Sequence, residues 1–333
     1  MSEIKKHYEA LDGLRAFSCI GIVMMHVLAN ANFNLTGFAF ERMIPSFTNF
    51  VFLFMVISGF GMCCGYYDKV ISNKINIADF YIKRYKKIFP FFALLSLIDF
   101  AFSPSIEAFY EVIANMTLCF GLIPNANISV IGVGWFLGVV FVFYLIFPFY
   151  CFLLSNKVRA WTAFFISCVV NILCRIYFNA GRSSIAYCFV YFMAGGLIYL
   201  YKNELEKIAA VKWIALIIFI ISVVVYYIVP EYLIISLILN CALVVFSINL
   251  TGKSLLNNTF TRVIGGLSFE IYLCHMVIYR VVEKLHLMRM VESDLVNYCI
   301  VLFLVFCGAI LFAYVSQQVL NRCISFIERK VKE

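Results

Sequence analysis

The chain has 333 residues, of which 64% are hydrophobic and 13% are charged, and its mean hydropathy is +0.96. Such a composition excludes a water-soluble globular protein, because one core cannot enclose so many apolar side chains. The formal net charge is +8, but the basic residues gather between apolar runs, so we expect membrane lipid as a partner and no nucleic acid.

Continuous apolar runs predict an all-α protein, a polytopic bundle of about ten transmembrane helices. The runs are about 16 to 23 residues long, which suits helices that cross a hydrocarbon core, and they lack the alternating polarity of barrel strands. We expect residues 1–333 to form a single integral-membrane domain. The predicted spans cover residues 14–31, 47–65, 88–103, 135–154, 160–178, 185–201, 211–229, 232–250, 264–283 and 297–319.

The first run carries an arginine and a histidine on one stripe. Eleven positions separate Arg15 from His26, so a helix places both side chains on one face, roughly 16 Å apart. Ionisable groups at such depth are costly and usually face a bundle interior or a wet cavity, so the pair is a candidate functional site. Asp12, three residues before Arg15, either orients the arginine or is an ordinary interfacial acid.

The densest positive charge lies in the loop of residues 66–88, which includes Lys83, Arg84 and Lys87 just before the third run. Two interpretations are open. One is membrane topology together with attraction to anionic lipid, worth about 1 kcal/mol per basic residue. The other is a binding site for a cytosolic polyanion, because arginine and lysine both hold phosphates.

Prolines and asparagines interrupt the apolar character of residues 104–134. If residues 110–123 nevertheless crossed the membrane, the number of spans would be eleven. Ten spans with a cytoplasmic N-terminus place most of the 26 basic residues on the inner side, as the positive-inside rule predicts. We therefore expect residues 104–134 to form an outer-side loop with a short interfacial or re-entrant helix. Both termini are expected in the cytoplasm, and the protein in the inner or plasma membrane.

Polar residues in the ninth run extend the candidate site. His275 lies about as far along that run as His26 lies along the first, so it is a candidate for acceptor contact or proton relay. The structural alternative is a hydrogen bond between two helices. Glu270 lies deeper toward the inner half and needs a partner, such as Arg15 or a tyrosine.

Further residues have both a structural and a functional interpretation. Trp135 and Tyr144 either line an acceptor groove or belong to an interfacial aromatic belt. Ser58 and Gly59 are expected to allow close approach of two helices. The 13 cysteines show neither a C-x-x-C pair nor the spacing of Cys and His ligands, so we expect no metal site.

Five motifs follow one another along the chain. They are Leu11–Arg15 with His26, similar to R-x10-H; Phe52–Phe60, similar to an S-G-F helix; Lys83–Pro90, similar to R-x-x-R-I-x-P; Trp135–Pro148, similar to W-F-L…Y-L…P; and Ser268–His275, similar to S-Y-x-I-Y-L-x-H. Together they resemble the membrane-bound acyltransferase 3 family, the integral-membrane O-acyltransferases that modify bacterial surface glycans. The resemblance covers nearly the whole chain.

The resemblance implies transfer of an acyl group, most simply acetyl from acetyl-CoA, to a hydroxyl of a cell-envelope polysaccharide or lipid-linked saccharide. It implies His26 as general base or as acyl-carrying nucleophile, and no bound cofactor. Arg15, together with Arg84, Lys87 and Lys83, is then expected to hold the phosphates of acyl-CoA. The remaining candidates, on the donor side, the acceptor side or in support, are Asp12, His275, Glu270, Trp135, Tyr272 and Ser58.

The chain departs from the family pattern in two places. Lys87 stands where the family often has a second arginine, which keeps the charge and loses bidentate phosphate binding. The fourth run has Gly138-Val139-Val140 where many members have an acidic residue, so no carboxylate there can orient a catalytic histidine. A glycan or lipid transporter without acyl transfer is the alternative function, and no oligomeric state is predicted.

Overall fold

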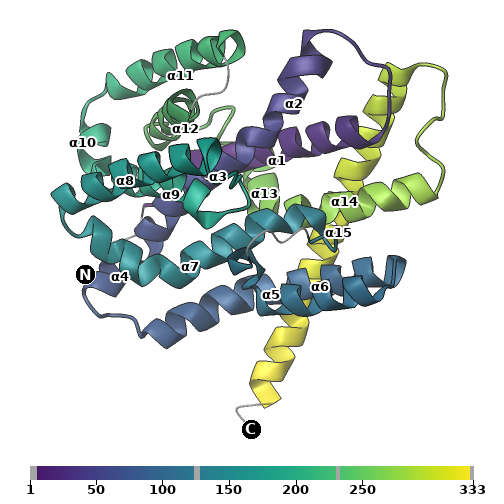
Figure 1. Ribbon diagram of the computed structural model, residues 1–333, viewed down its shortest axis with the longest axis horizontal. Helices are drawn as coiled ribbons and strands as arrows, with labels where there is room; N and C mark the ends of the chain where they lie inside the picture. Colours follow the sequence, from purple (N-terminus) through teal and green to yellow (C-terminus); the bar gives the residue numbers. More distant parts are fainter. Residues whose placement is uncertain (1–5, 124–127, 230–232, 331–333) are drawn as a thin grey trace.

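The computed structural model describes residues 6–123, 128–229 and 233–330 of the chain. Within these ranges the chain is helical and has no β-strand, so the predicted all-α class is confirmed (Figure 1). The α-helices are α1 Glu9–Asn30, α2 Ile44–Ser46, α3 Phe50–Met62, α4 Asp68–Ile71, α5 Ile77–Phe102, α6 Ile106–Thr117, α7 Trp135–Leu154, α8 Lys157–Ile176, α9 Ile185–Leu200, α10 Lys202–Lys207, α11 Val211–Ile228, α12 Leu233–Ile248, α13 Thr259–Gly266, α14 Ser268–Lys284 and α15 Asp294–Lys330.

Side-chain caps mark the beginnings of several helices. The side chains of Asn76, Ser105, Asn156 and Asn258 accept backbone N–H groups at the first turns of α5, α6, α8 and α13. Such caps satisfy donors that have no partner inside the helix. These four helices therefore begin where the sequence supplies a short polar side chain.

Six described helical stretches are long and apolar enough to cross a membrane, and a seventh exists if α13 and α14, which meet at a bend of 70°, count as one. The predicted runs at 185–201 and 232–250 coincide with α9 and α12, which have 16 residues each; position 232 lies outside the described residues. The run at 88–103 is the apolar half of α5. All ten runs thus lie on helices, while ten membrane crossings stay a prediction. The six stretches are Glu9–Asn30, Ala39–Ile71, Gly132–Leu154, Lys157–Ile176, Val211–Ile228 and Asp294–Phe326.

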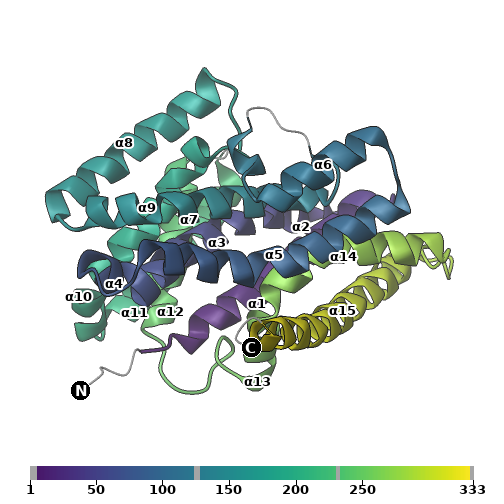
Figure 2. The same ribbon diagram turned by 90° about the horizontal axis from the view of Figure 1, so that it is seen from below.

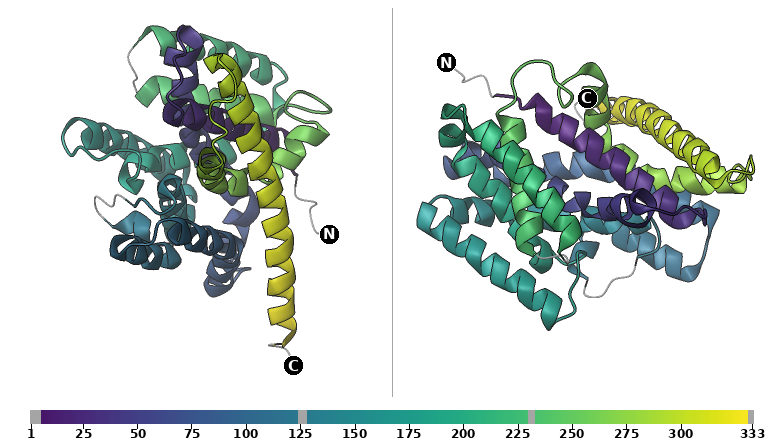
Figure 3. Two further views of the ribbon diagram at one scale, coloured as in Figure 1. Left: turned by 90° about the vertical axis from the view of Figure 1, so that its right-hand side faces the viewer. Right: turned by 90° about the horizontal axis from the view of Figure 1, so that it is seen from above.

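The first helix is the centre of the bundle. It packs against α3, α12, α13, α14 and α15, so its residues meet elements from both halves of the chain. In Figure 2, α8 lies at one face of the bundle and α15 at the opposite face, with α1, α3 and α7 between them. The long α15 runs along one edge and extends beyond the other helices toward the C-terminus (Figure 3).

Two glycines allow α3 and α9 to cross at close range. A Cβ atom on Gly59 would lie 2.4 Å from the carbonyl oxygen of Phe192, and one on Gly195 would lie 2.2 Å from that of Val56. Any larger residue would push the two backbones apart, which is how small residues act at helix contacts in membranes. The expectation that Gly59 permits close helix approach is confirmed.

The segment of residues 104–134 contains the short helix α6, as expected, and α6 packs against α5. One carboxylate oxygen of Glu111 accepts the backbone N–H groups of Ser129 and Val130, at 2.9 and 2.8 Å. The amide of Asn115 donates to the carbonyl of Val130 at 3.0 Å. These bonds hold Ser129 and Val130 on α6. Residues 124–127 of the predicted outer loop lie outside the described residues.

An ion pair between Asp99 and Arg280 joins α5 to α14. The Asp99 side chain is only 3% exposed, while that of Arg280 is 37% exposed. The second carboxylate oxygen of Asp99 accepts the N–H of Ile131 at 2.8 Å. A buried carboxylate is tolerable only when it is paired in this way, so this contact fixes two helices and the start of the segment that leads into α7.

We expect Arg280→Gln to lower the free energy of unfolding by about 2 kcal/mol, because it leaves a buried carboxylate without its counter-charge. The value lies below that of a fully buried pair because Arg280 is partly exposed. Thermal unfolding of the purified protein in detergent measures the effect.

The matched control is Arg289→Gln, which removes an exposed arginine whose guanidinium donates only to the carbonyl of Asn32. The double variant Asp99→Asn/Arg280→Gln should be less destabilised than Arg280→Gln alone. Equal unfolding midpoints for Arg280→Gln and Arg289→Gln would contradict a structural role for the pair.

Candidate functional site

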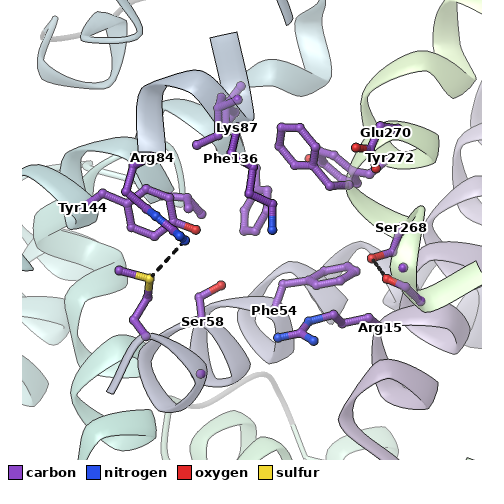
Figure 4. Close-up of a pocket in the computed structure, with 18 of the residues that line it drawn as sticks. Arg15, Phe54, Ser58, Arg84, Lys87, Phe136, Tyr144, Ser268, Glu270 and Tyr272 are labelled. Carbon is purple, nitrogen blue, oxygen red and sulfur yellow. Dashed lines mark hydrogen bonds between the residues drawn. The ribbon is translucent and has the colours of Figure 1, made fainter. Parts of the chain in front are cut away.

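A cavity of about 440 Å³ opens between α1, α3, α5, α7 and α14 and is called here the basic cavity. Figure 4 shows Arg15, Arg84 and Lys87 around one space, contributed by α1 and α5. Ser58 and Glu270 also line it. The structure thus brings together side chains that lie more than 250 positions apart in the sequence.

Arg15 is held by an acid on its own helix. Its Nη1 donates to Oδ1 of Asp12 at 2.6 Å, while Oδ2 of Asp12 lies 2.9 Å from Nε2 of His7. The other end of the guanidinium passes over Gly61 of α3, where a Cβ atom would lie 3.5 Å from Nη2. Of the two interpretations of Asp12, the structure supports the one in which it orients Arg15.

Arg84 is held by aromatic rings. Its guanidinium lies 4.7 Å from the ring centre of Tyr66 and 5.9 Å from that of Tyr144, and its Nη2 donates to the Tyr66 hydroxyl at 2.5 Å. Cation–π contacts of this kind fix a planar guanidinium without neutralising its charge. Tyr144 therefore lines the basic cavity. The sequence analysis did not single out Tyr66, which lies at the start of the basic loop.

The two lysines of α5 that were predicted to bind phosphate differ in position. Lys87 lines the basic cavity, one turn after Arg84, whereas Lys83 is not among the lining residues. Positions three apart on a helix share a face, so Arg84 and Lys87 turn toward the cavity together. Of the four predicted cations, the structure brings together Arg15, Arg84 and Lys87.

Glu270 supplies an unused acceptor to the same cavity. The residue is only 9% exposed, and its Oε2 has no hydrogen-bond partner among the described residues. The expected pairing with Arg15 or a tyrosine at this oxygen is wrong, because Arg15 turns to Asp12 instead. The carboxylate interacts electrostatically with Lys87. A ligand with N–H groups finds an acceptor there.

Three aromatic rings close one side of the basic cavity and are called here the aromatic trio: Phe54, Phe136 and Tyr272. The ring centres of Phe136 and Tyr272 lie 5.3 Å apart, and those of Phe54 lie 5.9 and 6.4 Å from them. The Tyr272 hydroxyl donates to the carbonyl of Val133 at 3.0 Å, which fixes its ring. Tyr272 also lies 6.0 Å from the ring of His275. It therefore lines the cavity and also lies beside His275.

The two predicted histidines lie side by side. The ring centres of His26 and His275 are 5.1 Å apart, inclined by 44°. Nδ1 of His275 lies 2.6 Å from the carbonyl of Tyr272. A carbonyl only accepts, so we assign the proton of His275 to Nδ1 and a lone pair to Nε2. This Nε2 is buried and has no partner among the described residues.

Trp135 lies apart from the basic cavity. It lines a second cavity of about 720 Å³ together with Arg182, whose guanidinium lies 5.2 Å from the Trp135 ring centre. The positive charge of Arg182 also interacts electrostatically with the His26 ring. Arg182 was not predicted from the sequence. The available signal was a basic residue in the short loop 177–184, which ten spans place on the side that is poor in basic residues.

We expect the basic cavity to bind inorganic pyrophosphate, and Arg84→Gln to weaken this binding about tenfold, because a charged hydrogen bond contributes about 1.5–3 kcal/mol. Isothermal titration calorimetry at low ionic strength measures the affinity, and added salt should weaken it. Lys83→Gln is the matched control, with a change of less than about twofold, since that lysine faces solvent. Equal losses in the two variants would contradict an anion site in the cavity.

Comparison with known proteins gives one match. The sequence model of the acyltransferase 3 family, described as an acyltransferase domain, matches residues 8–314, nearly the whole chain. No curated protein and no solved structure matches the chain. The matched range contains the aromatic trio, both histidines and every residue that lines the basic cavity except Gln317. The chain therefore belongs to the acyltransferase 3 family and is an acyltransferase.

Proposed function

We propose that the protein transfers an acyl group, most simply acetyl, from acyl-CoA to a hydroxyl of a cell-envelope polysaccharide or lipid-linked saccharide. The observation that carries the proposal is the succession of a basic cavity, an aromatic trio and a pair of histidines inside one acyltransferase domain. Tyr272 connects the three because it lines the cavity and lies beside His275.

The basic cavity suits the phosphate-bearing end of acyl-CoA. Arg15 and Arg84 are each held in place by side chains of the protein, so little conformational freedom is lost when a phosphate binds. Lys87 adds a third positive charge. The volume of about 440 Å³ lies in the usual range for ligand sites. Oε2 of Glu270 can accept an amide N–H of the pantetheine arm as it passes toward the histidines.

His26 performs the chemical step. As general base, its neutral imidazole takes the proton of the acceptor hydroxyl while the hydroxyl oxygen bonds to the thioester carbonyl carbon. The carbon–sulfur bond then breaks, and CoA leaves as a thiolate that takes up the proton. His275, fixed through Nδ1, orients the neighbouring ring and keeps a lone pair available at Nε2.

The alternative role for His26 is nucleophile. The imidazole then attacks the thioester carbonyl carbon, CoA thiol leaves, and the acyl-imidazole is cleaved by the acceptor hydroxyl in a second step. This route releases one equivalent of CoA per enzyme in the absence of acceptor, whereas the general-base route releases none. A stopped-flow measurement of free thiol distinguishes the two.

The proposed arrangement directs the acyl group from the cytosolic side of the membrane toward the outer side. With the N-terminus in the cytoplasm of a cell with an inner or plasma membrane, Arg15 and the end of α5 that carries Arg84 lie at the cytosolic side, where acyl-CoA is made. His26 then lies near the middle of the membrane, about 16 Å away along α1. An acceptor on the outer side can meet the acyl group without CoA crossing the membrane.

We expect His26→Ala to lower acyl transfer at least about 100-fold, the usual contribution of a general acid–base group, while CoA binding stays unchanged. Arg15→Ala should instead weaken CoA binding. Release of acetate from envelope glycans, measured by mass spectrometry at matched protein levels, reports transfer in cells.

Unchanged acetylation in the His26→Ala strain would contradict the proposal. Movement of a glycan lipid across proteoliposomes without any acyl donor would support the transporter alternative instead. His286→Ala is the matched control, because this histidine lies at the end of α14, is exposed and lines neither cavity.

A further inference from the structure

The second cavity, of about 720 Å³, borders the first turn of α7 and is called here the Trp135 cavity. Neighbouring residues of this turn face different cavities: Trp135 lines the Trp135 cavity, while Phe136 lines the basic cavity and belongs to the aromatic trio. The two cavities therefore approach each other across one helical turn. A donor in one and an acceptor in the other can meet there.

Arg182 is the only charged residue among the described residues that line the Trp135 cavity. Its Nη1 donates to the hydroxyl of Thr48, and its guanidinium lies over the Trp135 ring. No carboxylate of the described residues lies within ion-pair distance of it. A guanidinium has five N–H donors, so it keeps donors for a planar anion after the contact with Thr48.

The rest of the lining suits a sugar. Asn179, Ser183 and Ser184 supply polar groups along one wall, and Trp135 supplies an aromatic ring. Sugar hydroxyls hydrogen-bond to such side chains, while the apolar face of a pyranose ring packs on an aromatic ring. Asn179 has a φ of 50°, a left-handed conformation that asparagine tolerates best among residues with a Cβ atom.

The Trp135 cavity is also close to the candidate base. The positive charge of Arg182 acts on His26, and His26 in turn contacts His275 beside Tyr272. An anionic group bound to Arg182 would therefore lie within electrostatic reach of His26, the residue that we propose takes the hydroxyl proton. A hydroxyl on the same or the adjoining sugar can reach it.

We infer that the Trp135 cavity binds the acceptor through an anionic group, a carboxylate or a phosphate, held by Arg182 next to a sugar ring at Trp135. The inference rests on the proposed function and adds the acceptor's charge to it. Two sources fit this chemistry: a uronic acid in the glycan, or the diphosphate of a lipid-linked saccharide. Both place an anion beside a sugar hydroxyl.

The test uses the fluorescence of Trp135. The chain has three tryptophans, and the other two, Trp161 and Trp213, are exposed, so Trp161→Phe/Trp213→Phe leaves Trp135 as the single reporter. The full chain in detergent is titrated with methyl glucuronide, with geranyl diphosphate and with the neutral control methyl glucoside. CoA binding is measured on the same samples by calorimetry.

We expect saturable quenching by one of the anionic probes, at an affinity at least about tenfold above that of methyl glucoside. Adding Arg182→Gln should remove this preference, whereas the matched Arg289→Gln should keep it. Preference for methyl glucuronide identifies a uronic acid as the source, and preference for geranyl diphosphate identifies a lipid-linked diphosphate.

Equal affinities for charged and neutral probes, or a preference that survives Arg182→Gln, would overturn the inference. If CoA binding and acyl transfer persist in such a case, the proposed function stands and only the anionic acceptor falls. If the protein with an intact Arg182 does not bind CoA in the calorimetric measurement, the proposed function itself is contradicted.

Discussion

A charged side chain inside an apolar bundle needs a partner or a polar cavity, and this requirement organises the whole protein. Arg15 pairs with Asp12, Arg280 pairs with Asp99, and Arg84 lies between two tyrosine rings. The contact of Arg280 joins α14 to α5, and that of Arg84 joins α5 to α7, whereas Asp12 holds Arg15 within α1. Tyrosine rings hold Arg84 and the largely buried Asp12 holds Arg15, and both guanidinium groups line the basic cavity, where an anionic ligand can meet them.

The same requirement separates the steps of the proposed reaction in space. On α1 and on α14 the residue of the basic cavity comes first and the histidine follows, from Arg15 to His26 and from Glu270 to His275. The histidines meet at 5.1 Å beyond Tyr272. In the proposed reaction, phosphate binding and proton transfer are therefore expected at different depths, with the aromatic trio between them.

The sequence predicts much of this arrangement because apolar length and helical periodicity are local properties. All ten apolar runs lie on helices, yet the number of crossings depends on the 70° bend before Ser268, which packing decides. Helical periodicity puts Lys87 on the same face as Arg84 and equally on the same face as Lys83. Only the fold shows that Arg84 and Lys87 line the cavity. Arg182 lies in a loop, where no period marks a functional side chain.

The central claim is that acyl-CoA enters the basic cavity with its thioester directed to His26. A cryo-electron-microscopy structure with a non-hydrolysable acetyl-CoA analogue tests it most directly. We predict density for the phosphates between Arg15 and Arg84, and for the thioester end beyond the aromatic trio, beside His26. Phosphates bound elsewhere, or an acyl end that points away from the histidines, would contradict the account.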